Sequence, residues 1–310
     1  MNALRNVRHL LLLTALTVAA AGCAGGADEE ARPNESTRVP VLVSLATGTA
    51  GSSDLWLVEP DGRLRNLTES SDDELGASWS PDGERIVFVR SYRDEPRIGG
   101  TDLFILDVAS GTVEELLVDD LDQRSPAWSP DGSRIAFVGE KGIAVAALYT
   151  IRPDGTGLRL VGGLGRHPEA PAWSPAGDRI AFRGKSGSDD EGRIHVVDAK
   201  GGEETPVSAG PIDREPDWSP RATEILFIRG FEPRAVDVET GEERSLRAHA
   251  VLAAWHDAEG SVLVVRPTAD ASTENLENEL VLLRPDGTLE PIATLPALAL
   301  SSPRPRPGLR

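Results

Sequence analysis

Short apolar runs recur along this chain, and polar segments rich in Gly, Pro and Asp separate them. The runs are short and consist mainly of β-branched, aromatic and other apolar residues, which favours strands over helices. One series of runs stands at residues 86–89, 135–138, 180–182, 225–228 and 262–265, and a second at residues 103–106, 148–151, 194–197 and 280–283. Asp-Gly pairs such as Asp154-Gly155 follow the second series and predict hairpins, because Gly accepts positive φ.

A Trp-containing phrase precedes each run of the first series. It reads Trp-Ser-Pro-Asp-Gly twice, Trp-Ser-Pro-Ala-Gly once, and then decays. The tryptophans are 49, 45, 45 and 37 residues apart, and this period predicts a repeat architecture. We expect each Trp to pack between repeats and each Ser-Pro-Asp-Gly to form a tight turn, which should be looser in the last two repeats. The five structural tryptophans are Trp79, Trp128, Trp173, Trp218 and Trp255.

Each repeat of about 45 residues predicts a four-stranded antiparallel meander. Such sheets arranged radially make an all-β, six-bladed β-propeller. Residues 39–45, 54–58 and 64–68 supply three strands of the first blade, which has no Trp strand before them. The segment 297–303 resembles the missing strand, so we expect the ring to be closed by the C-terminal strand. Closure would remove the exposed sheet edges of an open ring.

The phrase Pro-x-Trp-Ser-Pro-Asp-Gly-x-x-Ile-Ala-Phe, at residues 126–137 and nearly at 171–182, resembles the TolB-like β-propeller repeat. The resemblance covers residues 39–303 and implies the propeller fold. It leaves the function open, because the family includes periplasmic scaffold proteins, propeller domains of prolyl-peptidases and some polysaccharide lyases. The N-terminal domain expected of TolB itself has no counterpart here, so the resemblance is to the family and not to TolB.

The N-terminus has the pattern of a bacterial lipoprotein signal. Arg5 and Arg8 precede an apolar stretch at residues 10–21, and small residues precede Cys23. We expect removal of residues 1–22, lipidation of Cys23, a flexible tether at residues 23–38 and a short tail at 304–310. The protein would then be exported and anchored to the bacterial membrane, facing the periplasm or the exterior. An ordinary secretory signal, with Cys23 incidental, is the alternative.

The net charge and the absence of known catalytic motifs reduce the number of functions that fit this chain. The chain has 50 acidic and 32 basic residues, and its net charge of −18 would repel nucleic acid. Its single cysteine excludes an intramolecular disulfide. The sequence has no His-Glu-x-x-His, Gly-x-Ser-x-Gly elbow, phosphate loop or dinucleotide fingerprint. We therefore expect a monomer without a cofactor and without catalytic residues.

Candidate binding residues lie in the connections that lead into the Trp strands and in the long connections between second and third strands. In a propeller these connections share one face around the channel, which we call the funnel face. Positions four to six before each Trp vary between repeats, as expected where a ligand is recognised. Solvated ion pairs at the rim are the alternative. The candidates are Tyr92, Arg93, Gln123, Arg124, His167, Glu169, Arg214 and His249.

Three functions remain open from the sequence. The first is a non-catalytic scaffold that binds an envelope protein through the funnel face. The second is a lyase or hydrolase that uses a metal held by His167, His249 and nearby carboxylates. The third is a sensor of a glycan or peptide.

Overall fold

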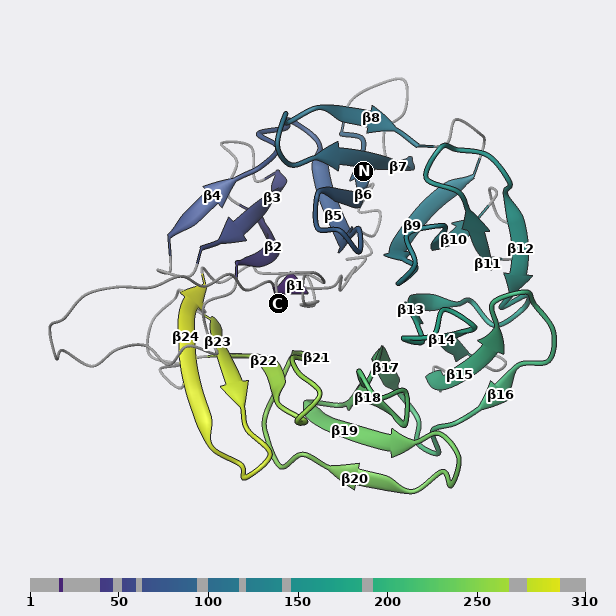
Figure 1. Ribbon diagram of the computed structural model, residues 1–310, viewed down its shortest axis with the longest axis vertical. Coiled ribbons are helices and arrows are strands. Elements are labelled where there is room, and N and C mark those ends of the chain that lie inside the picture. Colours follow the sequence, from purple (N-terminus) through teal and green to yellow (C-terminus); the bar gives the residue numbers. More distant parts are fainter. Residues whose placement is uncertain are drawn as a thin grey trace, which may run out of the picture.

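The computed structural model describes residues 17–18, 40–46, 52–59, 63–93, 100–116, 121–140, 146–185, 192–267 and 278–295. The regular elements in these ranges are β-strands, and they form four-stranded antiparallel sheets arranged around a central axis (Figure 1). The prediction of an all-β propeller with four-stranded antiparallel blades is confirmed.

Five blades follow the predicted order, with the Trp strand innermost and the fourth strand outermost (Figure 1). The first three are β5 (Asp73–Trp79), β6 (Arg85–Ser91), β7 (Thr101–Asp107), β8 (Val113–Glu115); β9 (Asp122–Trp128), β10 (Ile135–Glu140), β11 (Ala147–Ile151), β12 (Arg159–Gly162); and β13 (Glu169–Trp173), β14 (Arg179–Lys185), β15 (Gly192–Asp198), β16 (Thr205–Pro206). The other two are β17 (Asp213–Trp218), β18 (Glu224–Arg229), β19 (Glu232–Asp237), β20 (Glu243–Ser245); and β21 (Leu252–Trp255), β22 (Val262–Pro267), β23 (Asn278–Leu283), β24 (Leu289–Leu295).

The remaining sheet corrects the predicted closure. It contains β1 (Thr17–Val18), β2 (Val41–Ala46), β3 (Ser53–Val58) and β4 (Leu64–Asn66), in that order. Within the described residues the structure thus has five complete blades rather than six, and Thr17–Val18 occupies the place beside β2 that the sequence assigned to residues 297–303. Without β1, the edge of β2 would offer unpaired backbone groups, which any extended segment within reach can satisfy. Residues 297–303, Cys23 and the tether at 23–38 lie outside the described residues.

The tryptophans of the five complete blades lie between neighbouring sheets. Each is at most 8% exposed and packs on apolar side chains of the sheet before it in the chain. Hydrogen bonds add to this packing: the backbone N–H of Trp128 donates to Ser78 Oγ at 3.1 Å, and that of Trp255 donates to Asp217 Oδ2 at 2.8 Å. Each Trp therefore joins two blades, as its size and apolar surface favour.

A β-bulge recurs three residues before the Trp in four of these blades. Two residues of the first strand there oppose one Phe of the second strand, and that Phe is fully buried. The bulged residues have positive φ, at Gly76, Ser125, Ala170 and Glu215. A bulge bends its strand and redirects the side chains before it. The blade β21–β24 has neither the Phe nor the register shift.

The turn after each Trp is closed by a side-chain hydroxyl or carboxylate. In the β9–β10 turn, Ser129 Oγ accepts the N–H of Arg134 at 2.9 Å and donates to Asp131 at 2.6 Å, while Gly132 adopts a φ of +72°. The prediction of a looser turn is wrong for β17–β18, where Ala222 takes a φ of +59° and its N–H still bonds Ser219 O at 2.8 Å. The corresponding backbone bond of the β21–β22 turn is longer, at 3.4 Å.

Candidate functional site

The funnel face carries all the candidate positions, because antiparallel strands place the connections into β5, β9, β13, β17 and β21 on the same side as the second-to-third-strand connections. The opposite side, which we call the turn face, carries the turns after the first and third strands of each blade. The sequence-predicted residues divide into those committed to the fold and those exposed to solvent.

The three candidate arginines are held by internal partners. Arg93 makes two bonds to the Asp73 carboxylate, at 2.7 and 2.8 Å, and this contact raises the pKa of its guanidinium. Arg124 pairs with Glu140 on the neighbouring strand. Arg214 donates to the carbonyls of Gly230 at 2.9 Å and Val251 at 3.0 Å, and burial lowers its pKa. These arginines fix the connections of the funnel face.

Three further candidates also have structural contacts. Gln123 is fully buried, and its Oε1 accepts the backbone N–H of Leu103 at 3.1 Å. Tyr92 is half-buried against the apolar cluster around Trp79. Glu169 is exposed at the rim, where it pairs with Arg183 at 2.5 Å and lies 3.8 Å from Lys185. Ion pairs at the rim of the funnel face, which were the alternative to ligand binding at these positions, are therefore observed for Glu169, Arg93 and Arg124.

The two candidate histidines are exposed, and apolar side chains accompany them. His249, in the connection into β21, stacks on Phe231 of the β18–β19 turn with ring centroids 5.1 Å apart and an interplanar angle of 16°. Phe231 is 55% exposed and Ile212, in the connection into β17, is 48% exposed. Leu164, in the same connection as His167, is 60% exposed. The funnel face thus presents apolar side chains in three connections.

The sequence analysis missed Phe231 and Leu164 as site residues. A signal was present, since Leu164 stands between Gly163 and Gly165, and Phe231 follows Gly230. An apolar side chain in a glycine-containing turn has no strand to bury it, so it is expected to face solvent.

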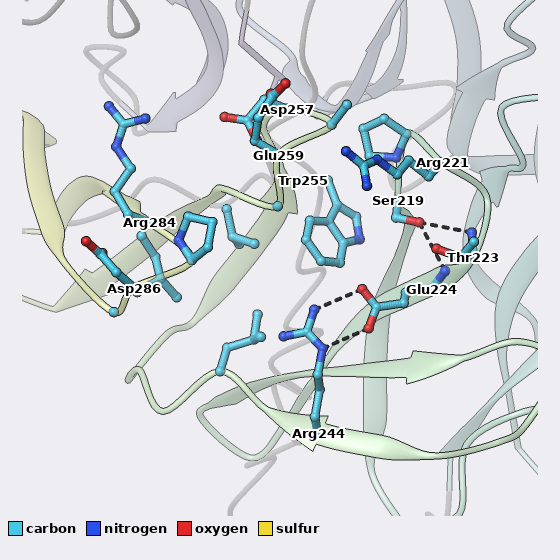
Figure 2. A pocket seen from close by; sticks show the side chains of 18 of the residues that line it. Ser219, Arg221, Thr223, Glu224, Arg244, Trp255, Asp257, Glu259, Arg284 and Asp286 are labelled. Atoms are coloured by element: carbon cyan, nitrogen blue, oxygen red, sulfur yellow. Dashed lines mark hydrogen bonds and ion pairs between the residues drawn. The ribbon is translucent and has the colours of Figure 1, made fainter.

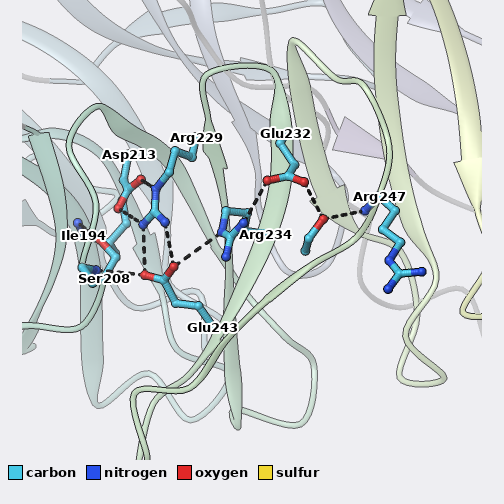
Figure 3. Close-up of polar contacts among 10 residues, drawn as sticks. Ile194, Ser208, Asp213, Arg229, Glu232, Arg234, Glu243 and Arg247 are labelled. Carbon is cyan, nitrogen blue, oxygen red and sulfur yellow. Dashed lines mark hydrogen bonds and ion pairs between the residues drawn. The ribbon is translucent and has the colours of Figure 1, made fainter.

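A chain of ion pairs supports this part of the funnel face (Figure 3). Arg229 bridges Asp213 and Glu243, with contacts of 2.6 and 2.7 Å. Arg234 continues the chain from Glu243 at 3.4 Å to Glu232 at 2.9 Å. The Arg229 guanidinium holds the pKa of Glu243 below its usual value. The network joins β17, β18, β19 and β20 and keeps Phe231 and Ile212 on a rigid base.

The blade β5–β8 has a smaller version of the same contact. Glu74 occupies the position of Asp213, five residues before the Trp, and Arg90 pairs with it at 2.6 Å. Glu74 is fully buried and burial raises its pKa, although the bonds from Thr68 and Arg90 act in the opposite direction. A single cation at a buried site offsets less of the cost of burying a carboxylate than the network around Asp213 does.

The turn face contains a groove of about 580 Å³ between the blades β17–β20 and β21–β24 (Figure 2). The β17–β18 turn and β20 form one wall, and the β21–β22 and β23–β24 turns form the other. Trp255 lies between these walls in the view of Figure 2, with charged side chains around it. The sequence analysis placed no site on this face.

Within the described residues, no group of three or more His, Cys, Asp or Glu side chains is arranged to hold a metal ion. His167 and His249 belong to the connections into β13 and β21, which are not neighbouring blades. The described segments also contain no helix long and apolar enough to cross a membrane.

Comparisons with known proteins agree with this geometry. The family model of the TolB beta propeller domain matches residues 78–240, slightly more than half of the chain. A protein TolB homolog of Chlorobium luteolum is 42% identical over 116 residues, which are 37% of this chain and 26% of that protein. The chain thus matches about a quarter of the length of this curated relative.

Solved structures show the same fold at low identity. TolB from Acinetobacter baumannii superposes with a TM-score of 0.67 at 18% identity, over 85% of this chain and 66% of that one. An oligogalacturonate lyase in complex with manganese superposes with a TM-score of 0.58 at 14% identity, over 84% of this chain and 74% of that one. At such identities the likeness concerns the fold alone.

Proposed function

Because this chain belongs to the TolB beta propeller domain family, we propose that it is a non-catalytic scaffold that binds a protein partner on its funnel face. The single observation that carries the proposal is the set of exposed apolar side chains there: Leu164, Ile212 and Phe231. Exposed apolar side chains on an otherwise strongly acidic protein favour a binding surface, because their solvent exposure costs free energy that a partner recovers.

The stacked pair of Phe231 and His249 would be the anchor of the interface. Aromatic side chains bury a large area with few rotatable bonds, and they dominate binding energies at interfaces. Phe231 is held by its short turn and by the Arg229 network beneath it, so little conformational entropy would be lost on binding. The candidate arginines act here by positioning: Arg214 ties the connection into β21 to the β18–β19 turn.

We further propose that the protein is exported and held at the bacterial envelope by a lipid on Cys23. The signal pattern of residues 1–23 supports this, and the tether at 23–38 would then leave the funnel face accessible.

Removal of residues 1–22 would also remove Thr17–Val18 from β2, so that residues 297–303 could pair there. Deleting residues 297–310 should then lower the thermal midpoint of the processed protein, and an unchanged midpoint would contradict this closure.

The enzymatic alternative, a metal-dependent lyase or hydrolase, rests on fold likeness to proteins such as the manganese-bound oligogalacturonate lyase. The glycan or peptide sensor rests on the same funnel face. Both alternatives predict that small molecules, and not a protein, bind near His167 and His249.

The test is site-directed photo-crosslinking in the native envelope, with the reactive residue placed at position 231. We expect one specific protein adduct, which should disappear when Ile212→Ser or Leu164→Ser is added, because these positions would share the interface. A crosslinker at Thr205, which is exposed on the outermost strand β16, is the matched control and should give no such adduct. Absence of any adduct from position 231, or equal adducts from both positions, would reject the proposed surface.

A further inference from the structure

The groove on the turn face coincides with the two blades whose repeat phrase has decayed. Its walls come from the Trp-Ser-Pro-Arg-Ala phrase of β17–β18 and the Trp-His-Asp-Ala-Glu-Gly phrase of β21–β22. Both turns keep the closing backbone bond, at Ser219 and at Asp257, so the changes in sequence are not needed to preserve the fold. Repeats that keep the scaffold while they change exposed side chains are expected where a ligand binds.

One substitution within the repeat opens the groove. Six residues after the Trp, the first three complete blades have Arg, and Arg85 and Arg179 lie over the Trp of the next blade at 5.0 and 4.8 Å. The fourth has Glu224 instead, which is shorter and carries the opposite charge. Glu224 holds Arg244 of β20 through bonds of 2.8 and 2.9 Å, and that guanidinium stays 6.0 Å from the Trp255 ring. With this contact Trp255 is only 2% exposed, so the ring itself is covered and the groove opens beside it, along Glu224 and the turns of the last blade (Figure 2).

A second substitution supplies a free positive charge. Three residues after the Trp, Asp82 and Asp131 bond the Ser hydroxyl of their turns, whereas Arg221 takes this place in the β17–β18 turn. Arg221 and Arg247 both line the groove and are exposed, and neither side chain forms an ion pair with any of the described residues. An unpaired guanidinium is a strong donor for a carboxylate, which it can bind through two parallel bonds.

The other side of the groove supplies acceptors. Asp257, Glu259 and Asp286 line it from the last blade, and Figure 2 shows them around the mouth of the groove. Trp255 is 2% exposed, and its indole N–H finds no acceptor among the described residues. The indole N–H of Trp218 likewise finds no acceptor among the described residues, whereas those of Trp128 and Trp173 donate to backbone carbonyls.

We propose that this groove binds a small ligand with a carboxylate at one end and an ammonium or hydroxyl donor at the other. The carboxylate pairs with Arg221 or Arg247, and the donor end faces Asp257 and Glu259. The volume of about 580 Å³ suits a molecule between a dipeptide and a disaccharide in size. Peptides with an acidic residue and sugar acids share this chemistry. Most of the lining belongs to the turn face, whereas Arg247 comes from the connection into β21, which also carries His249.

The test is isothermal titration calorimetry of the full chain with two matched probe pairs. The C-terminally amidated dipeptide Ala-Glu-NH2 is compared with Ala-Gln-NH2, so that the side-chain carboxylate is the only one present, and glucuronate is compared with glucuronamide. We expect at least one carboxylate probe to bind at least about tenfold more tightly than its amide, because the amide cannot accept a charge-assisted pair of bonds. The pair that responds identifies the ligand as peptide or sugar acid.

Variants locate the binding to the groove. The double variant Arg221→Ala/Arg247→Ala should weaken the carboxylate probe at least about tenfold, while Arg159→Ala, an exposed Arg of β12, should leave the affinity unchanged. All positions are exposed, so folding should be preserved, and equal thermal midpoints without the probe check this. The proposal is overturned if no carboxylate probe binds at millimolar concentration, if the amides bind equally well, or if the double variant binds like the parent.

Discussion

The blade β9–β12 and the blade β17–β20 show what the repeat requires and what it permits. Both keep the buried Trp, the fully buried Phe, the bulge opposite it and a hydrogen-bonded turn. In β9–β12 the turn contains Asp131 and Gly132, and the Asp131 carboxylate accepts hydrogen bonds from the Ser129 hydroxyl and the Ser133 N–H within the same turn. In β17–β20 the turn carries Arg221 and Ala222, and the blade borders both the groove and the exposed Phe231.

The contrast between these two blades distinguishes the side chains that the fold requires from surface side chains that can vary. The side chains that join blades recur in both, because each interface needs the same large apolar ring in the same place. Departures from the repeat accumulate on the surface of β17–β20 and β21–β24, where they add charge and exposed apolar area. The same division predicts how mutations in the two regions should differ.

Truncation of an interface tryptophan should have the largest effect. Trp128→Ala should cost about 3–5 kcal/mol of unfolding free energy, because it leaves a cavity between two closely packed blades. Trp255→Ala should cost less, about 2–3 kcal/mol, since the cavity it leaves borders the groove, from which water can enter. Urea unfolding of the two variants measures both values. Equal losses would mean that the groove does not loosen the last interface.

Removal of a buried cation should follow in size. Arg229→Met leaves Asp213, which is fully buried, and Glu243 without their shared partner, and we expect a loss of about 2–4 kcal/mol. Arg90→Met should cost about 1–2 kcal/mol, because burial has already raised the pKa of Glu74 and a proton can replace the cation there. Unfolding at pH 7 and pH 5 tests this comparison. The loss for Arg90→Met should shrink at pH 5, and a loss as large as that of Arg229→Met would contradict it.

His195 should make the blade β13–β16 sensitive to acid. It stacks on Phe182, in the place that Phe104 and Tyr149 hold in the two preceding blades, and burial lowers its pKa below 6.5. At pH well above 6.5, His195 is neutral in both the folded and the unfolded protein. As pH falls from 6.5 towards the lower pKa that His195 has in the folded protein, the unfolded chain binds a proton at this side chain and the folded chain does not. Stability should therefore fall over this window.

The variant His195→Phe should reduce that slope, because its ring fills the same position without titrating. The measurement is the thermal midpoint of parent and variant between pH 5 and pH 7.5. His195→Tyr is the control for ring size and should behave like the Phe variant. If both variants keep the slope of the parent, the acid sensitivity arises elsewhere in the chain.

Relief of backbone strain in the β17–β18 turn should have the smallest effect. Ala222 has a φ of +59°, a conformation that costs a residue with a Cβ about 1 kcal/mol. Ala222→Gly should raise the unfolding free energy by about 0.5–1 kcal/mol, and Gly132→Ala in the β9–β10 turn should lower it by a similar amount. Denaturant midpoints of the two variants give the comparison. A destabilising Ala222→Gly would show that the turn is not strained.

Much of the fold could be predicted from sequence because each blade repeats the same short-range contacts. The Trp spacing and apolar runs predict the four-stranded blades, and Pro126, Pro171 and Pro216 coincide with the bulges of three of them. Closure could not be predicted, because pairing with the edge of β2 depends on which distant segment reaches it, and Thr17–Val18 does so in this structure.

The candidate site was harder to predict, since the partners of its charged residues are far apart in sequence. Arg93 meets Asp73 across 20 residues, and Arg214 reaches Val251 across 37. Position relative to the Trp placed these residues on the funnel face but did not indicate which side chains remain exposed there. Burial decides this, as the contrast between buried Gln123 and exposed His249 shows.

The most direct test of the two-face account is to measure both binding activities in the same two variants. Once crosslinking has identified the partner, its affinity and that of the carboxylate probe are measured for Phe231→Ala/Ile212→Ser and for Arg221→Ala, which lies in the β17–β18 turn. We expect the first variant to lose only the partner and the second to lose only the probe. Loss of partner binding in the second variant, or its retention in the first, would contradict the assignment of recognition to the funnel face.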